Sequence, residues 1–500
     1  MKKKIILPLF FLIFSIYALT SRAHVISDGA VTFIQTVNFV NTGSLCFAKQ
    51  PDGSEFGRTI KTKISQNKQY CYTIEPLRFL NYIVPVATGV ILEKITGKDP
   101  KHKFAHFLCG LWNAFIATMA NIIFFLLLLK LSVYEKKALF MTLALSFSTQ
   151  LWFYSRNIFM EYFQLLWILL SLYLLLLFYL ENNKKWFFIS YLLAGLIVAL
   201  KFSSITYSLT LFLILPYLFL KKNINIRDVL LSLLLLYSGI LIFSFANWLK
   251  FGEYTLNIKH TYMMNVLGRG RFESYITGLW GILFSPGKSI LLYNIPILFA
   301  LPYFKEYYKR HRESALFTLL FSTITIFAVA SRNWTGGMGW GPRYLSMIVP
   351  LLIIPLAYGK NIILKIAFVS GIIFQIPSII LPSYSYAKLI NILGYTTSRT
   401  IVDSTNFIPS MSSLILYWKL FISRILFKLG LSTGYIKALD WNKGFVKINT
   451  SNISEFWFWF FEDIPIYLKL FAVILILSAT TSLFFLIKNT TNKTKKENNG

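Results

Sequence analysis

The 500-residue sequence has few charged residues, which make up 14% of it, against about 25% in ordinary soluble domains. Hydrophobic residues make up 56%, and the mean hydropathy is +0.59. A soluble core could not bury so much apolar surface, so we expect lipid to be the main solvent of the chain. The composition therefore predicts an all-α polytopic membrane protein.

Acidic residues are scarce, with 20 against 50 lysines and arginines, and the formal net charge is +30. Such a charge can indicate a protein that binds nucleic acid. Here the basic residues recur in short loops between apolar runs, which is how membrane proteins fix their orientation. No soluble module with interleaved aromatic and basic residues is visible, so the sequence predicts no nucleic-acid partner.

Cysteine is rare, and the common metal and nucleophile motifs are missing. The three cysteines, Cys46, Cys71 and Cys109, have no CxxC or CxxH neighbour, which argues against a zinc or thioredoxin-like site. No HExxH motif, paired His/Cys ligands or serine nucleophile elbow is present. Cys46 and Cys71 would pair only in an oxidising compartment, and the sequence favours two unpaired thiols over a disulfide.

The triplet Gly287-Lys288-Ser289 is the nearest approach to a nucleotide-binding loop. Five residues separate Gly281 from Gly287, where that loop requires four. The segment is also predicted to face away from cytosolic ATP. We therefore exclude a nucleotide site and expect Lys288 to meet a lipid phosphate at the membrane interface.

Apolar runs predict about twelve membrane spans. Three lysines precede the first run, 5–19, which has features of a signal peptide, but the cleavage site at 21–23 is mediocre and favours an uncleaved first helix. The other predicted spans lie near 104–129, 138–154, 158–180, 186–200, 203–220, 229–248, 282–303, 315–331, 344–357, 362–382 and 467–487.

The loops between these spans carry a consistent charge pattern. Alternation places the N-terminus, the tail after 488 and five loops on the cytoplasmic side, and each contains lysine or arginine. Those loops are 130–137, 181–185, 221–228, 305–313 and 359–361. Because hydropathy alone defines the spans, the charges are independent support for this topology.

Two other apolar runs are predicted to lie on the outer membrane surface. Pro85 interrupts the run at 79–92, and basic residues interrupt the run at 414–429. No internal repeat is apparent. The predicted organisation is a multi-span domain over 1–382 with a first outer loop at 22–103, an outer region with an interfacial helix over 383–466, and a last helix with a cytoplasmic tail over 467–500.

Glu161 is an ionisable residue at the start of an apolar run, at the predicted outer mouth of its helix. Such residues are costly in a membrane and usually functional. A second explanation is a first-turn glutamate that the helix dipole stabilises, paired with Arg156. The sequence does not decide between the two.

Asp28 follows the first helix and opens a segment with one apolar stripe at helical spacing, formed by Phe33, Ile34, Val37 and Val40. The pattern predicts a surface helix that ends at Gly43. Ser27 or Asp28 would cap its N-terminus, and capping is the favoured explanation of Asp28 considered alone.

A glycine-rich segment at 332–344 has four glycines in six positions, with two tryptophans and two arginines around them. Such a backbone can approach a ligand closely, and Arg343 suits a phosphate or a carboxylate. An aromatic anchor with a flexible turn is the alternative. Lys201, between two short spans, is also predicted to face the outer side.

Several of these segments, taken together in their order along the chain, resemble the GT-C glycosyltransferases that use lipid-linked sugars. The resemblance is to the branch of the protein O-mannosyltransferases and aminoarabinose transferases. The matching segments are 27–29 with 41–45, Glu161 in its apolar helix, 195–201, 251–252, 284–288 and 341–344. Each is weak alone, and the ordered set is specific for the superfamily but not for a sugar or an acceptor.

The resemblance implies a sugar transfer from a polyprenyl-phosphate donor to a lipid, glycan or protein acceptor on the non-cytoplasmic face. Asp28 would be the general base, Glu161 would orient the acceptor or the base, and cations would bind the donor phosphate. The candidate cations are Arg343, Lys201, Lys288 and Arg156. A single displacement would invert the anomeric centre.

One departure concerns metal ions. The family often has an acidic pair where this chain has Asp28-Gly29, so no cofactor is assigned and a divalent cation stays open. The sequence is rich in lysine, isoleucine and asparagine, which is typical of an AT-rich genome and favours a bacterium. We therefore expect the bacterial inner membrane, with the site facing the periplasm or exterior. A multi-span transporter or lipid flippase is the alternative function, and a non-catalytic scaffold is a third.

Overall fold

The computed structural model describes residues 3–21, 28–49, 62–64, 68–72, 75, 77–97, 102–222, 224–252, 272–330, 334–337, 339–381, 406–431, 435–440, 444–449 and 466–498. Nearly all of the regular structure in these ranges is α-helical. Eight helical stretches are long and apolar enough to cross a membrane. The chain is therefore an integral membrane protein, as its composition predicts.

The eight stretches are 78–96, 104–130, 161–181, 202–221, 226–251, 312–330, 361–380 and 470–489. They belong to η2 (Arg78–Tyr82) with α3 (Ile83–Thr96), α4 (Lys103–Lys130), α7 (Glu161–Glu181), η3 (Phe202–Ser204) with α9 (Ile205–Lys221), α10 (Ile226–Phe251), α16 (Arg312–Ala330), α18 (Asn361–Ile380) and α22 (Ile466–Asn498). Two apolar helices of 17 to 18 residues, α1 (Lys3–Thr20) and α8 (Lys184–Leu200), pack among them. The first of the eight stretches covers the run predicted to lie on the membrane surface.

Three predicted spans are broken rather than continuous. The run 138–154 forms α5 (Glu135–Phe147) and α6 (Leu151–Ser155), with a turn between them. The run 282–303 contains the end of α12 (Phe272–Phe284), then α13 (Ile290–Tyr293), α14 (Ile295–Ala300) and η4 (Leu301–Tyr303), and leads into α15 (Phe304–Arg310). The run 344–357 forms η5 (Arg343–Leu345), α17 (Val349–Ile353) and η6 (Ile354–Tyr358). Polar groups at these breaks bond to distant segments: the Ser148 hydroxyl donates to the Phe368 carbonyl, and the backbone N–H of Gln150 donates to the Asn294 side chain. Such contacts permit broken helices in a membrane protein.

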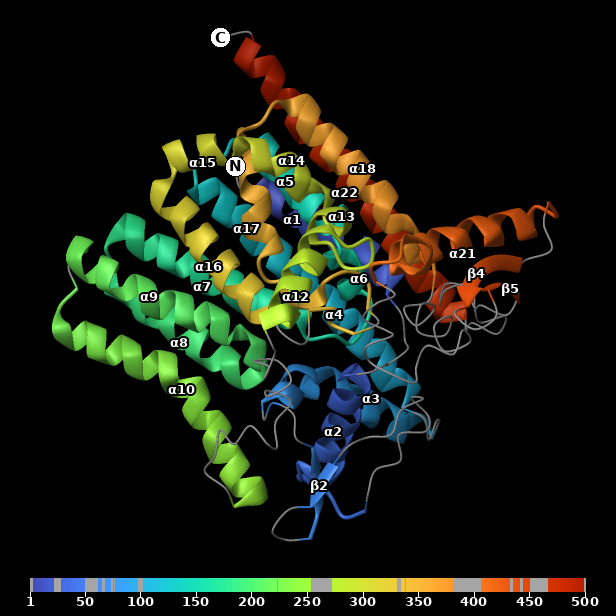
Figure 1. Cartoon of the computed structure of the whole chain (residues 1–500), viewed down its shortest axis with the longest axis horizontal. Helices are drawn as coiled ribbons and strands as arrows, with labels where there is room; N and C mark the ends of the chain where they lie inside the picture. Colours follow the sequence, from blue (N-terminus) through green and yellow to red (C-terminus); the bar gives the residue numbers. More distant parts are fainter. Residues whose placement is uncertain are drawn as a thin grey trace.

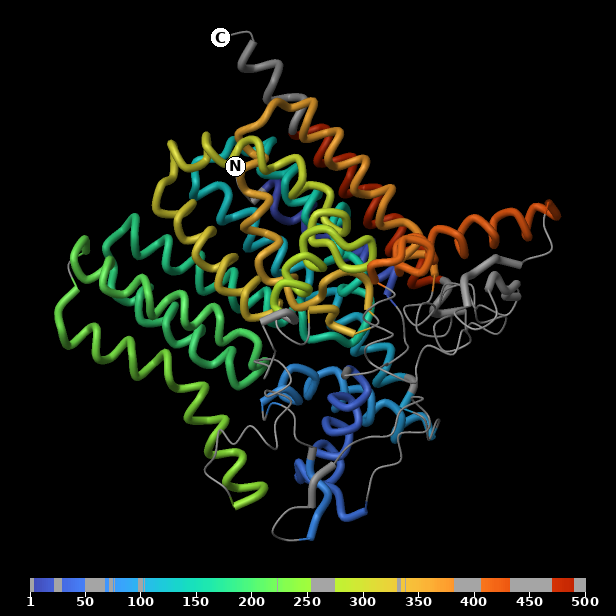
Figure 2. The backbone as a smooth tube through the Cα atoms, viewed as in Figure 1, coloured from blue at the N-terminus to red at the C-terminus, as the bar shows by residue number. Residues whose placement is uncertain are grey.

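The helices form one bundle, with α8, α9 and α10 as a layer along one side of α7 (Figures 1 and 2). Helices α8 and α10 approach closely at two glycines. A Cβ atom on Gly195 would collide with the Leu235 carbonyl, and one on Gly239 would collide with the Gly195 carbonyl. Small residues at such a crossing allow tight helix packing in lipid.

Both termini lie at the same end of the bundle, at the top of Figure 1. The predicted cytoplasmic loops contact one another. Lys137 donates to the carbonyls of Ala357 and Gly359, and Lys184 pairs with Asp228 at 2.6 Å. The contacts join loops that the topology assigns to the same side.

At the opposite end lie α2 (Asp28–Thr42) and a three-stranded antiparallel sheet, together called the extramembrane unit below, with η2 and α3 packed against α2 (Figure 1). The sheet has the order β1 (Cys46–Phe47), β3 (Tyr70–Tyr72), β2 (Thr62–Ile64). The predicted surface helix is confirmed in extent: α2 ends at Thr42, and Gly43 follows with a φ of 71°.

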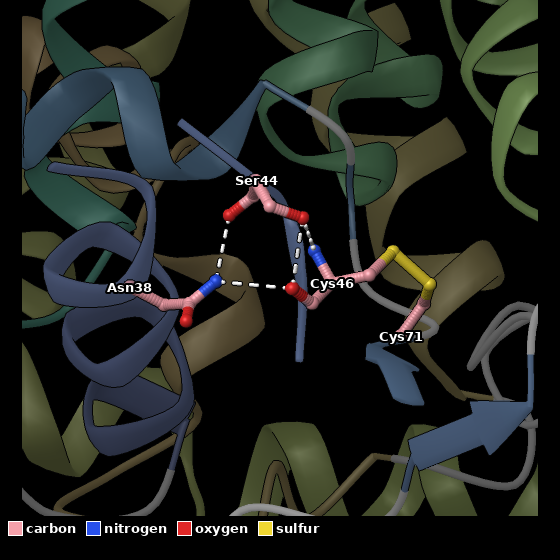
Figure 3. Close-up of a disulfide and its surroundings, with 4 residues drawn as sticks. All are labelled: Asn38, Ser44, Cys46 and Cys71. Atoms are coloured by element: carbon pink, nitrogen blue, oxygen red, sulfur yellow. Dashed lines mark hydrogen bonds between the residues drawn. A yellow bond between two sulfur atoms is a disulfide. The ribbon is translucent and has the colours of Figure 1, made fainter. Parts of the chain in front are cut away.

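A disulfide joins Cys46 to Cys71, where β1 pairs with β3 (Figure 3). The interpretation that favoured two unpaired thiols is therefore wrong. Sequence spacing does not reveal that the two strands are neighbours, and the sheet register places the cysteines opposite each other. The Asn38 amide donates to the carbonyls of Ser44 and Cys46, which joins the disulfide to the end of α2.

The C-terminal part contains η8 (Pro409–Met411), the amphipathic helix α21 (Ser413–Lys428) and a hairpin of β4 (Tyr435–Asp440) and β5 (Gly444–Asn449). Helix α21 matches the run predicted to be interfacial, while the hairpin was not predicted. Helix α22 packs against α1, and Asn489 donates to the Lys4 carbonyl.

Candidate functional site

Glu161 is the first residue of α7, and its side chain is 3% exposed. Its Oε1 atom accepts a hydrogen bond from Lys201 Nζ at 2.9 Å. The same oxygen lies 3.9 Å from Arg343 Nε. The carboxylate therefore pairs with Lys201 rather than with Arg156, the pairing considered from sequence.

Breaks in the helices place both cations. Lys201 follows α8 in an extended conformation, before the turn η3 leads into α9. Arg343 lies in η5, after a glycine and a proline. Its guanidinium donates to the Tyr344 hydroxyl at 3.0 Å and its Cζ lies 4.9 Å from the centre of that ring. Because neither cation lies inside a long helix, both can reach the start of α7.

One oxygen of the Glu161 carboxylate has no use inside this cluster. Two buried cations face one carboxylate, and a buried ion pair is stable only when its other polar atoms are satisfied. The Oε2 atom of Glu161 is buried and has no hydrogen-bond partner among the described residues. The cluster of Glu161, Lys201 and Arg343, called the outer cluster below, thus combines two buried cations with an unused acceptor.

The outer loop also reaches the outer cluster. The backbone N–H of Leu77 donates to the Ala199 carbonyl at 3.3 Å, and that of Phe202 donates to Glu75 Oε1 at 3.3 Å. Glu75 is 3.5 Å from Arg78. These contacts fix the chain around Lys201 to the segment between β3 and η2.

Asp28 is the first residue of α2, and its side chain lies outside the described part of the structure. Its backbone position is fixed by Gly29, which packs against the carbonyl of Ile158 so closely that a Cβ atom would collide. Ile158 is three residues before Glu161 in the turn that precedes α7. The structure therefore brings the start of α2 beside the start of α7.

The glycine-rich segment wraps around Lys288. The Lys288 ammonium is buried and donates to the carbonyls of Gly337, Gly339 and Gly341, at 2.8, 2.6 and 3.2 Å. Gly336, Gly337 and Gly341 have φ between 61° and 79°, a region that favours glycine. Lys288 therefore shapes the loop that presents Arg343.

Helix α6 holds the same loop from the other side. The Tyr154 hydroxyl donates to the Trp340 carbonyl at 2.6 Å. The Gln150 amide donates to the Pro342 carbonyl and to the Ser346 hydroxyl. Hydrogen bonds from α6 and from Gln150 just before it thus hold the chain on both sides of Arg343.

Arg156 is buried and joins the ends of two helices. Its Nε donates to the carbonyl of Thr20 at 2.7 Å, and its Nη1 to that of Ser378 at 2.5 Å. Arg156 and Lys288 thus donate hydrogen bonds to backbone carbonyls, whereas Lys201 and Arg343 lie beside the Glu161 carboxylate. The predicted phosphate contacts of all four cations stay predictions.

The sequence did not single out Gln164, which lies one turn after Glu161 on α7. Its amide donates to the hydroxyls of Ser203 and Ser204, at 3.1 and 2.9 Å. It fixes the turn η3 that follows Lys201. A polar residue three positions after Glu161 in an apolar helix is the signal that could have indicated it.

Metal ligands do not gather in the described ranges: no group of three or more His, Cys, Asp or Glu there is placed to hold an ion. Comparisons of the chain with family models, with curated proteins and with solved structures find no match.

Proposed function

We propose that this protein is a GT-C-type membrane glycosyltransferase with about twelve spans that transfers a sugar from a polyprenyl-phosphate donor on the non-cytoplasmic face. The outer cluster carries the proposal. Glu161, Lys201 and Arg343 come from three distant parts of the sequence, and the resemblance to the GT-C glycosyltransferases implies one site for all three. In the structure one carboxylate oxygen contacts both cations.

The chemistry fits the charges of the outer cluster. The acceptor hydroxyl attacks the anomeric carbon while the bond from that carbon to the phosphate oxygen breaks, and Asp28 takes the hydroxyl proton. Negative charge grows on the departing polyprenyl phosphate, and Arg343 and Lys201 stabilise it where water is scarce. The free Oε2 of Glu161 can accept a hydrogen bond from a substrate hydroxyl.

The disulfide supports the assignment of the site to the non-cytoplasmic side. Disulfides persist in oxidising compartments such as the periplasm or the cell exterior. Cys46 and Cys71 belong to the same extramembrane unit as α2, whose first turn lies beside α7. A bacterial plasma membrane with this unit outside satisfies the disulfide and the charges of the loops together.

The test begins with a deletion strain, whose surface glycans and lipids are profiled for a missing sugar. Membranes from that strain, complemented with each variant, are then assayed with labelled polyprenyl-phosphate sugars. We expect Asp28→Asn, Glu161→Gln and Arg343→Lys each to reduce transfer by about 100-fold or more, the size typical of a lost acid–base or charge-stabilising group.

Glu181→Gln is the matched control, because Glu181 is the same residue type on the same helix and is exposed at the other end. It should retain transfer. Full transfer by Asp28→Asn would refute the assignment of the base. An unchanged glycan and lipid profile in the deletion strain, with altered movement of a lipid or solute, would instead indicate a transporter or flippase.

A further inference from the structure

A cavity of about 370 Å³ lies between α4, α7, α9 and α16. Its walls are mainly apolar and include Leu127, Leu172, Leu176, Ile214, Phe317 and Leu320. This volume is in the range of ligand sites in proteins. It is about the volume of a dozen water molecules in the liquid. The walls suit a hydrocarbon chain.

The cavity is remote from the outer cluster. It contacts α7 from Leu172 to Leu180, whereas Glu161 begins that helix. At about 1.5 Å per residue, Tyr179 lies about 27 Å along the helix axis from Glu161. The cavity therefore belongs to the opposite end of the bundle, which the loop charges predict to be cytoplasmic.

Lys130 and Arg310 provide positive charge at the rim of this cavity. Lys222 lies close by, with its Nζ 3.9 Å from the centre of the Tyr179 ring. His311 also lines the rim, but burial and the neighbouring Arg310 lower its pKa, which leaves it neutral at pH 7. The carboxylate of Glu313 is on the same rim and accepts from the Tyr217 hydroxyl at 3.4 Å.

Within the described ranges the acidic partners of the two rim cations are exposed carboxylates, and Arg310 also lies over the Tyr358 ring. Lys130 is 3.2 Å from Glu181, and Arg310 is 2.7 Å from Glu306. The Arg310 side chain is 60% exposed. Exposed ion pairs of this kind contribute little to stability because water screens them, so a phosphate can replace the carboxylates at little cost.

The cavity also has apolar residues on the outer surface of the bundle. Leu180, Leu316 and Tyr217 line it and are 52%, 46% and 41% exposed. On a membrane protein such surfaces face hydrocarbon. A ligand can thus enter sideways from the bilayer rather than from water.

We propose that this cavity binds one anionic phospholipid, with an acyl chain between α7, α9 and α16 and the phosphate at Lys130 and Arg310. A soluble anion would not use the apolar walls, and a neutral lipid would not use the cations. The proposal is independent of the transferase reaction.

The test uses the purified full-length chain after removal of bound lipid. Its melting temperature is measured with phosphatidylglycerol, phosphatidylcholine, inorganic phosphate or synthetic polyprenyl phosphate, and retained lipid is counted by native mass spectrometry. We expect phosphatidylglycerol to give the largest stabilisation and inorganic phosphate to give none. Equal effects of phosphatidylglycerol and phosphatidylcholine, stabilisation by phosphate alone, or a preference for polyprenyl phosphate would overturn the proposal.

Variants locate the effect in the cavity. The double variant Lys130→Gln/Arg310→Gln should bind phosphatidylglycerol about 30-fold more weakly, from about fivefold for each basic residue. Lys185→Gln removes an exposed cation of the same end outside the cavity and should bind as the wild type does. Leu176→Trp keeps both cations and fills the cavity, so it should also lose binding. Wild-type affinity in Leu176→Trp or in the double variant would refute the site.

Discussion

The two ends of α7 each carry a glutamate paired with a lysine, in opposite surroundings. Glu161 meets Lys201 at 2.9 Å with side chains 3% and 11% exposed. Glu181 meets Lys130 at 3.2 Å with side chains 46% and 31% exposed. The helix dipole favours the first glutamate and disfavours the second. The same pair of residue types is thus a costly, defined arrangement at one end and a weak surface contact at the other.

The largest contrast should appear in stability. Glu161→Gln removes the buried carboxylate that pairs with Lys201 and should lower the free energy of unfolding by about 3–5 kcal/mol. Glu181→Gln should lower it by about 1 kcal/mol or less. Unfolding of both variants in detergent, followed by fluorescence, measures the difference. Equal losses would show that burial of the outer cluster has no energetic consequence.

The disulfide gives a second contrast, because it ties only the extramembrane unit at the Glu161 end. Cys46→Ser should destabilise that unit by about 3 kcal/mol, since the bridge closes a loop with a sequence separation of 25. Limited proteolysis of the outer segment measures the loss. Reducing agent should accelerate cleavage of the wild type and leave Cys46→Ser unchanged; the same acceleration in both would contradict a structural bridge.

The smallest contrast is in salt dependence. Double-mutant cycles with glutamine for glutamate and methionine for lysine give the coupling energy of each pair. We expect about 0.5 kcal/mol for Glu181 and Lys130, falling further in 1 M salt, where exposed charges are screened. The coupling of Glu161 and Lys201 should be larger and should change little with salt. A salt-sensitive coupling at Glu161 would mean that water reaches the outer cluster.

Local patterns allowed several parts of the fold to be predicted. The long apolar runs correspond to α4, α7, α9, α10, α16 and α18, and the stripe of α2 with Gly43 gives that helix and its end. The breaks inside other runs were not predicted. Ser148 donates to the Phe368 carbonyl, and the backbone N–H of Gln150 donates to the Asn294 side chain. Partners so far apart in the sequence leave no local signal.

The candidate site also has residues whose role the sequence indicated and residues whose role it did not. Glu161, Lys201 and Arg343 are visible from sequence because ionisable groups are rare at the ends of apolar runs. Lys288 and Arg156 looked equivalent to them, yet the structure places both on backbone carbonyls. A buried cation has the same sequence signature whether it meets a carboxylate, a phosphate or a carbonyl. The sugar transfer itself stays a prediction.

The sequence by itself determined that the chain is a membrane protein, where its long helices lie and which of its charged residues are unusual. These properties depend on the transfer of side chains from water to lipid, which each residue carries with it. Tertiary structure alone decided which charges meet, which cysteines pair and where α7 acquires a cavity at one end and a buried ion pair at the other. Those outcomes depend on packing between distant segments, and the energies of burial and charge pairing are set by the neighbours that packing supplies.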